Sequence, residues 1–144
     1  MQLPIEFKSK ATASGEFVQP WLIECGEYSA KCAVPSEFGG VGDGFSPEDL
    51  FLQALMNCFI GTFKVYAKSS KIHFSKLELN GNLVVDQNSS REVRMHKCDL
   101  TVQIWGAERP DRAKTLADKV FRDGFILNSV KTEISYKLII EGIL

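Results

Sequence analysis

The sequence predicts an α+β fold with a mainly antiparallel sheet and one long central helix. Strand-like segments precede and follow a long apolar helix pattern, and a second helix pattern precedes the last strand. The composition is that of an ordinary globular protein, with 44% hydrophobic and 24% charged residues. The length of 144 residues suits one domain, so we expect a single domain over residues 1–144.

The first predicted element is a β-hairpin between residues 16 and 34. Its strands, residues 21–25 and 28–32, flank Gly26-Glu27, and glycine at the first loop position suits a type II′ turn. This pairing sets Cys32 opposite Trp21 and leaves Cys25 about 13 Å from Cys32, at about 3.3 Å per residue. That separation is too large for a disulfide between them. The glycine-rich residues 35–44 are expected to form a loop, because they lack the Gly-Lys-Ser/Thr ending of a phosphate-binding loop.

A strong helix start follows this loop. Ser46 is a capping residue, Pro47 fits the first turn, and Asp49 stands three residues after the cap. We expect a helix over residues 47–70 that is buried around most of its circumference, because its polar positions form one narrow stripe. These positions are Gln53, Asn57, Gly61, Lys64 and Lys68. In so small a chain, this points to a helix packed against a second subunit.

Three strands and a helix are predicted in the second half. Apolar residues alternate over residues 77–85 and 100–104, and Val93 and Met95 fall out of phase with the latter, which indicates a bulge near Lys97. Helical spacing begins at Pro110 and ends before Gly124, which is expected to act as a C-terminal glycine. Alternation over residues 134–140 predicts the last strand.

Charge and composition exclude several classes of function. Lys plus Arg is 17 and Asp plus Glu is 18, so the net charge of −1 gives no general basis for binding nucleic acid. No window reaches the ~20 apolar residues of a membrane span, and no signal-peptide pattern opens the chain. With four scattered cysteines, a cytoplasmic location is expected. His96 and Cys98 are possible ligands on one strand, but no metal-binding spacing accompanies them, so neither metal nor cofactor is expected.

Cys58, in the second half of the long helix, is the main candidate for chemistry. A free cysteine in an apolar helix is often a small buried hydrophobe. It lies too far from the helix N-terminus for the helix dipole to activate it. A reactive Cys58 therefore needs a cation or a hydrogen-bond donor from elsewhere in the protein. Cys98 is expected to face the core, and no resolving role is expected for it, for Cys25 or for Cys32.

Three segments together resemble the osmotically inducible protein C / organic hydroperoxide resistance (OsmC/Ohr) family. They are Pro-Ser-Glu-Phe-Gly-Gly-Val-Gly at 35–42, Phe-Ser-Pro-Glu-Asp-Leu-Phe at 45–51 and Ala-Leu-Met-Asn-Cys-Phe at 54–59. The resemblance implies an intertwined homodimer with the long helices at its centre. It also implies a peroxidase for oxidative-stress defence, in which Cys58 attacks an organic hydroperoxide and becomes a sulfenic acid. Glu48 matches the acid that orients an arginine against the thiolate, although on sequence alone an acid there suits the helix N-terminus.

Two departures from this family bear on the mechanism. Gly124 stands where the family carries its second, resolving cysteine, and no arginine precedes Arg91, although the family places one in the N-terminal hairpin region. The resemblance then implies a one-cysteine cycle in which an external thiol reduces Cys58. A competing interpretation is a catalytically degenerate dimer that binds a small apolar ligand. A third is a purely structural dimer.

Overall fold

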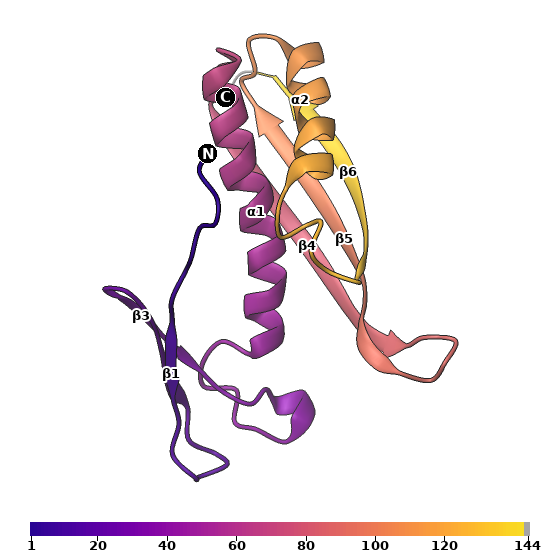
Figure 1. Ribbon diagram of the computed structural model, residues 1–144. Helices are drawn as coiled ribbons and strands as arrows, with labels where there is room; N and C mark the ends of the chain where they lie inside the picture. The colour runs from indigo at the N-terminus through magenta and orange to yellow at the C-terminus, as the bar shows by residue number, and fades with distance from the viewer. Residues whose placement is uncertain (143–144) are drawn as a thin grey trace. The chain divides into compact units, whose positions relative to one another are not determined.

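The computed structural model describes residues 1–142, which fall into two compact units, Met1–Phe51 and Leu52 onward. The predicted α+β class is confirmed, since two helices accompany two three-stranded sheets. Figure 1 shows the elements in chain order.

The first unit holds a three-stranded antiparallel sheet in the order β1-β2-β3. Strands β2 (Trp21–Cys25) and β3 (Tyr28–Cys32) form the predicted hairpin, with Cys32 opposite Trp21 and a φ of 64° at Gly26. The sequence did not predict β1 (Lys10–Thr12), because its three exposed residues carry no alternating apolar signal. The loop that follows contains a short 3₁₀ helix, η1 (Ser36–Phe38).

Position 40 of that loop must be glycine, because no side chain fits there. A Cβ atom at Gly40 would lie 1.9 Å from the carbonyl oxygen of Val34, closer than any side chain allows. The loop therefore folds back onto its own entry.

Helix α1 (Pro47–Ser69) begins where the sequence predicts it and ends one residue earlier. Its first turn is closed by a reciprocal pair of 2.9 Å bonds, in which the Asp49 amide donates to Ser46 Oγ and the Ser46 amide donates to the Asp49 carboxylate. The residues of the predicted polar stripe are all exposed, as expected.

The prediction that α1 is buried around most of its circumference is not met by this chain alone. Only Leu55, Phe59, Phe63 and Ala67 are buried, one residue per turn, and Val65 is 63% exposed. By length and composition α1 also qualifies as a possible membrane-crossing helix, which the sequence analysis did not anticipate. The core helix of a soluble protein meets the same description, so this finding by itself assigns no membrane.

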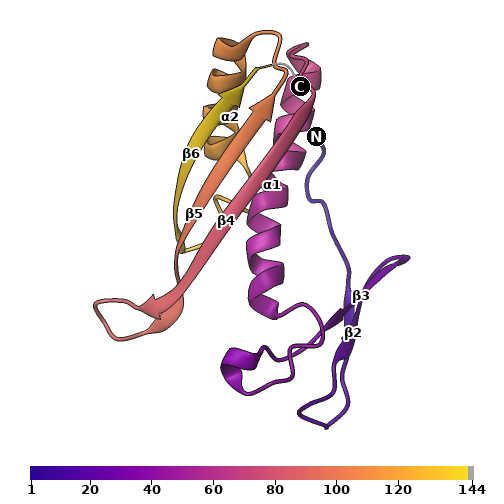
Figure 2. The same cartoon turned by 180° about the vertical axis from the view of Figure 1, so that it is seen from behind.

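The second unit holds a mixed sheet in the order β4-β5-β6, covered on one face by α1 and α2 (Figures 1 and 2). Strands β4 (Lys76–Gln87) and β5 (Val93–Trp105) are antiparallel. Helix α2 (Pro110–Asp123) then leads back to β6 (Glu133–Glu141), which runs parallel to β5. Gly81 of β4 lets α1 approach closely, because a Cβ there would meet Leu52 at 2.9 Å and Met56 at 3.2 Å.

The register change predicted near Lys97 is confirmed. Val84 pairs with Lys97 and Val85 pairs with Met95, so His96 is the extra residue of a bulge. On the helix-facing side, the core of β5 consists of Cys98, Leu100, Val102 and Ile104, each at most 2% exposed.

Candidate functional site: Cys58 and the end of α2

Cys58 is half-buried and lies on α1 beside the buried stripe of that helix. Helix α2 ends against the same region, since Phe59 packs on Phe121 with ring centroids 4.9 Å apart. Within residues 1–142 the Cys58 thiol has no hydrogen-bond partner. The unit that begins at Leu52 therefore supplies no hydrogen-bond donor to this thiol among its described residues.

Gly124 is the residue that α2 brings directly to the Cys58 sulfur. It occupies the C-cap position of α2, as expected, and its amide donates to the carbonyl of Val120 at 2.9 Å. Its backbone is not left-handed, however, with φ −59° and ψ 124°, a conformation open to every residue. The expected C-terminal glycine is therefore confirmed, although its backbone does not require a glycine.

The close packing around position 124 explains why a glycine stands there, whereas the backbone conformation does not. A Cβ built on Gly124 would lie 3.0 Å from Cys58 Sγ and 2.9 Å from Leu127 Cδ1. Any side chain here must displace one of these two neighbours. The missing side chain therefore lets the end of α2 pack directly against the thiol.

The separation of 3.0 Å also has a chemical meaning. An S–S bond of about 2.04 Å, with ordinary C–S–S angles, places the Cβ of one cysteine about 3 Å from the sulfur of the other. Positions 58 and 124 thus have the spacing of a disulfide pair from which one sulfur is missing. This spacing agrees with the resemblance, which sets Gly124 at the place of a second cysteine.

Glu48 and Cys58 are not brought together along their shared helix. Ten positions at 1.5 Å per residue separate them by about 15 Å, several times the reach of a carboxylate contact. Glu48 is half-buried in the first turn of α1, where an acid complements the exposed amide groups of the helix. Together with Asp49, its charge also contributes to raising the pKa of the Cys32 thiol.

The other cysteines differ from Cys58 in their surroundings. Burial is the main cause that raises the pKa of both Cys32 and Cys98, and Cys98 is fully buried, as the sequence predicted. A raised pKa keeps these thiols protonated and poorly nucleophilic at neutral pH. Cys25 is exposed, and all four cysteines are free.

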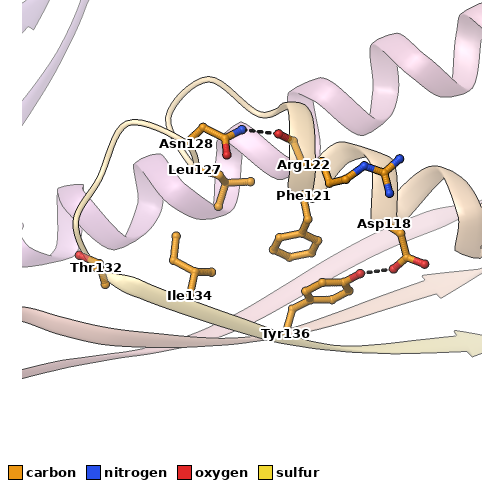
Figure 3. A pocket seen from close by; sticks show the side chains of 8 residues that line it. All are labelled: Asp118, Phe121, Arg122, Leu127, Asn128, Thr132, Ile134 and Tyr136. Carbon is orange, nitrogen blue, oxygen red and sulfur yellow. Dashed lines mark hydrogen bonds between the residues drawn. The ribbon is translucent and has the colours of Figure 1, made fainter.

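A cavity of about 480 Å³ opens between α2, the segment after it and β6. Figure 3 shows its lining, with Phe121 and Tyr136 stacked at 3.6 Å and the Tyr136 hydroxyl donating to Asp118. Burial, and then this hydrogen bond, raise the pKa of Tyr136 to about 12. The full lining is Asp118, Phe121, Arg122, Leu127, Asn128, Thr132, Ile134 and Tyr136.

The sequence analysis did not single out this cavity. Its polar residues come from a helix and from a strand that are adjacent only after the parallel pairing of β6 with β5. In the sequence, the cavity is indicated only by the i, i+4 spacing of Asp118 and Arg122. That spacing is common on exposed helix faces and does not point to a cavity. Among residues 1–142, no group of three metal-ligating side chains is present, and His96 and Cys98 form no such group.

Comparison with known proteins agrees with the fold. The model of a family described as OsmC-like protein matches residues 40–139. An organic hydroperoxide resistance protein of Xanthomonas axonopodis pv. citri is 40% identical over 83 residues, which cover 57% of this chain and 55% of that protein. The chain thus matches about half the length of its curated relatives.

Solved structures match over nearly the whole chain at low identity. An OsmC-like protein of unknown function from Vibrio cholerae has a TM-score of 0.84 and 17% identity, covering 94% of this chain and all of that one. An organic hydroperoxide resistance protein from Elizabethkingia anophelis has a TM-score of 0.72 and 20% identity, covering 99% of each chain. With the family model matching 100 residues from 40 to 139, the chain belongs to the OsmC-like protein family.

Proposed function

We propose that this protein reduces organic hydroperoxides in oxidative-stress defence, with Cys58 as the peroxidatic nucleophile and an external thiol as the reductant. The observation that carries the proposal is the approach of Gly124 to Cys58, since a Cβ at position 124 would lie 3.0 Å from the Cys58 sulfur. The resemblance sets a second cysteine at this position. Relatives that are named organic hydroperoxide resistance proteins support the choice of substrate.

The proposed cycle has three chemical steps. The Cys58 thiolate attacks one peroxide oxygen, the S–O bond forms, the O–O bond breaks, and the alcohol leaves after taking a proton. An external thiol then attacks the sulfenic sulfur, which forms a mixed disulfide and releases water. A second external thiol restores Cys58 and leaves as the external disulfide.

Because residue 124 is a glycine, this cycle uses only one cysteine of the protein, Cys58. In a pair of cysteines with this spacing, the second sulfur would close on the sulfenic acid before a solvent thiol arrived. Here residue 124 carries no sulfur, so the sulfenic acid is left for an external thiol to reduce.

We further propose that the protein acts as a cytoplasmic homodimer. The large apolar side chains that this chain leaves exposed support a second copy as partner; among them are Phe17, Phe38, Phe45, Val65 and Phe125. In a dimer, Glu48 of one copy is available to orient a cation toward Cys58 of the other. Within one helix, a separation of about 15 Å keeps the Glu48 carboxylate from touching Cys58 itself.

The experiment that tests the reaction is intact-protein mass spectrometry after a near-stoichiometric pulse of cumene hydroperoxide, with dimedone present to trap sulfenic acid. We expect one fast adduct that maps to Cys58. Cys58→Ser should abolish this adduct. The matched control Cys25→Ser, which removes an exposed thiol from the hairpin, should leave it unchanged.

One observation favours the ligand-binding alternative, namely the lack of any hydrogen-bond donor to the Cys58 thiol within residues 1–142. If no adduct forms, or if all four cysteines are labelled equally, the peroxidase proposal is wrong. A tightly bound apolar molecule in the purified protein would then support the alternative.

A further inference from the structure

The cavity at the end of α2 has the size and the mixed lining of a small-molecule site. Its volume of about 480 Å³ lies within the range of roughly 300–1,000 Å³ that is typical of ligand pockets. Leu127 is 7% exposed, and with Ile134 and the Phe121–Tyr136 stack it forms an apolar side. Figure 3 shows that Asp118 and Arg122 enter the lining from α2 and Asn128 from the segment after it, while Thr132 lies at the start of β6.

One oxygen of the Asp118 carboxylate in this cavity already accepts a hydrogen bond. Asp118 accepts the Tyr136 hydroxyl, and the pKa of Tyr136, raised to about 12, keeps that hydroxyl protonated and donating. The Asn128 amide nitrogen is also engaged, because it donates to the carbonyls of Arg122 at 2.5 Å and Gly124 at 2.8 Å. These bonds fix the wall of the cavity.

The positive charge has no partner. Asp118 and Arg122 stand at i, i+4 on α2, a spacing at which an acid and a base commonly pair. Within residues 1–142, however, the Arg122 guanidinium makes no ion pair and no hydrogen bond, since Asp118 is held by Tyr136. The guanidinium, which is always charged and carries five hydrogen-bond donors, therefore lines this mixed cavity without a partner.

From this arrangement we infer that the cavity binds a small organic anion, namely a carboxylate with a compact apolar or aromatic body. The carboxylate pairs with the Arg122 guanidinium, and the apolar body lies against Leu127, Ile134 and the stacked rings. A cationic group at the same position is disfavoured, because the Arg122 guanidinium repels it. The inference does not depend on Cys58 being reactive.

The test is a titration of the whole protein with 3-phenylpropionate. Isothermal titration calorimetry measures the affinity, and backbone amide NMR locates the residues whose signals shift. We expect saturable binding, with shifts that concentrate at Leu127, Thr132 and Ile134. The neutral analogue 3-phenylpropionamide should bind about tenfold more weakly or worse, because it cannot form the charge-assisted pair with Arg122.

Arg122→Gln should weaken 3-phenylpropionate binding by the same factor of about ten or more. The matched control Arg109→Gln changes another exposed arginine, at the opposite end of α2, and should bind as the unmodified protein does. Absence of saturation, equal affinity for acid and amide, or shifts that map away from the cavity would each overturn the inference. All three results come from the unmodified protein and stand whether or not the variants fold.

Discussion

Gly124 is the residue whose role changes most once the structure is considered. On the sequence it is a glycine after a helix, and its φ of −59° shows that the backbone does not need it there. Its missing side chain matters because Cys58 Sγ and Leu127 Cδ1 would both lie within 3.0 Å of a Cβ. Position 124 therefore sets how much room the candidate nucleophile has.

Gly124→Cys is expected to form a disulfide with Cys58 under mild oxidation. The Cβ position already has the spacing of such a bond. The oxidised variant should lose two thiols in an alkylation assay, and closure of this long loop should stabilise it by up to about 4 kcal/mol in urea unfolding. The double variant Cys58→Ser/Gly124→Cys is the control and should show neither effect. If both thiols of the single variant stay reactive, the two positions do not face each other in solution.

Tyr136 gives the fold a measurable dependence on pH. Burial, and then the hydrogen bond to Asp118, raise its pKa from 10 to about 12, so the folded state holds the phenol proton more tightly than the unfolded state does. This stabilisation is complete below pH 10 and is lost as the pH rises toward about 12.

Tyr136→Phe should accordingly remove part of the fall in the free energy of unfolding over that pH range. Urea unfolding of both proteins across the range measures the difference. The pKa of Tyr66 is also raised, by its hydrogen bond to Asp123, so a residual fall is expected in the variant. Parallel curves for the two proteins would contradict the role assigned to Tyr136.

Among the elements, α1 shows how local signals fix a boundary. The Ser46–Asp49 capping box satisfies amide groups that the first turn would otherwise leave without partners. The helix begins at Pro47 for this reason, although few of its residues are buried within the chain. The cap therefore carries a larger share of its stability than in a fully packed helix.

Ser46→Ala should destabilise the protein by about 1 kcal/mol, because the Asp49 amide loses its acceptor. Urea unfolding followed by helical circular dichroism measures this, and hydrogen exchange should be faster in the first turn of α1. Ser89→Ala, an exposed serine in the β4–β5 turn, is the matched control and should change stability by a few tenths of a kcal/mol at most. Equal stabilities of the two variants would show that the cap contributes nothing.

For the whole molecule, the exposed apolar surface predicts self-association. Analytical ultracentrifugation should give the mass of two copies. Val65→Glu, which sets a charge on the uncovered face of α1, should shift the protein toward one copy. Lys64→Glu, its neighbour on the polar stripe, should leave the mass unchanged. A single-copy mass for the unmodified protein would refute the proposed dimer.

The sequence by itself determined the elements that depend on neighbours along the chain. The 21–25/28–32 hairpin follows from Gly26, the start of α1 from Ser46 and Pro47, and α2 from its apolar spacing between Pro110 and Gly124. The bulge at His96 was readable from a change of alternation. The strand β1 could not be predicted in this way, because all three of its residues are exposed and give no alternating apolar pattern.

Only the tertiary structure decided which distant residues meet. The approach of Gly124 to Cys58, the Tyr136–Asp118 bond and the unpaired Arg122 all depend on α2 returning across the sheet so that β6 pairs with β5. Local patterns specify which face of each element is apolar, but not which neighbour covers that face. Chemistry that depends on contacts between elements therefore becomes visible only when those faces are packed together.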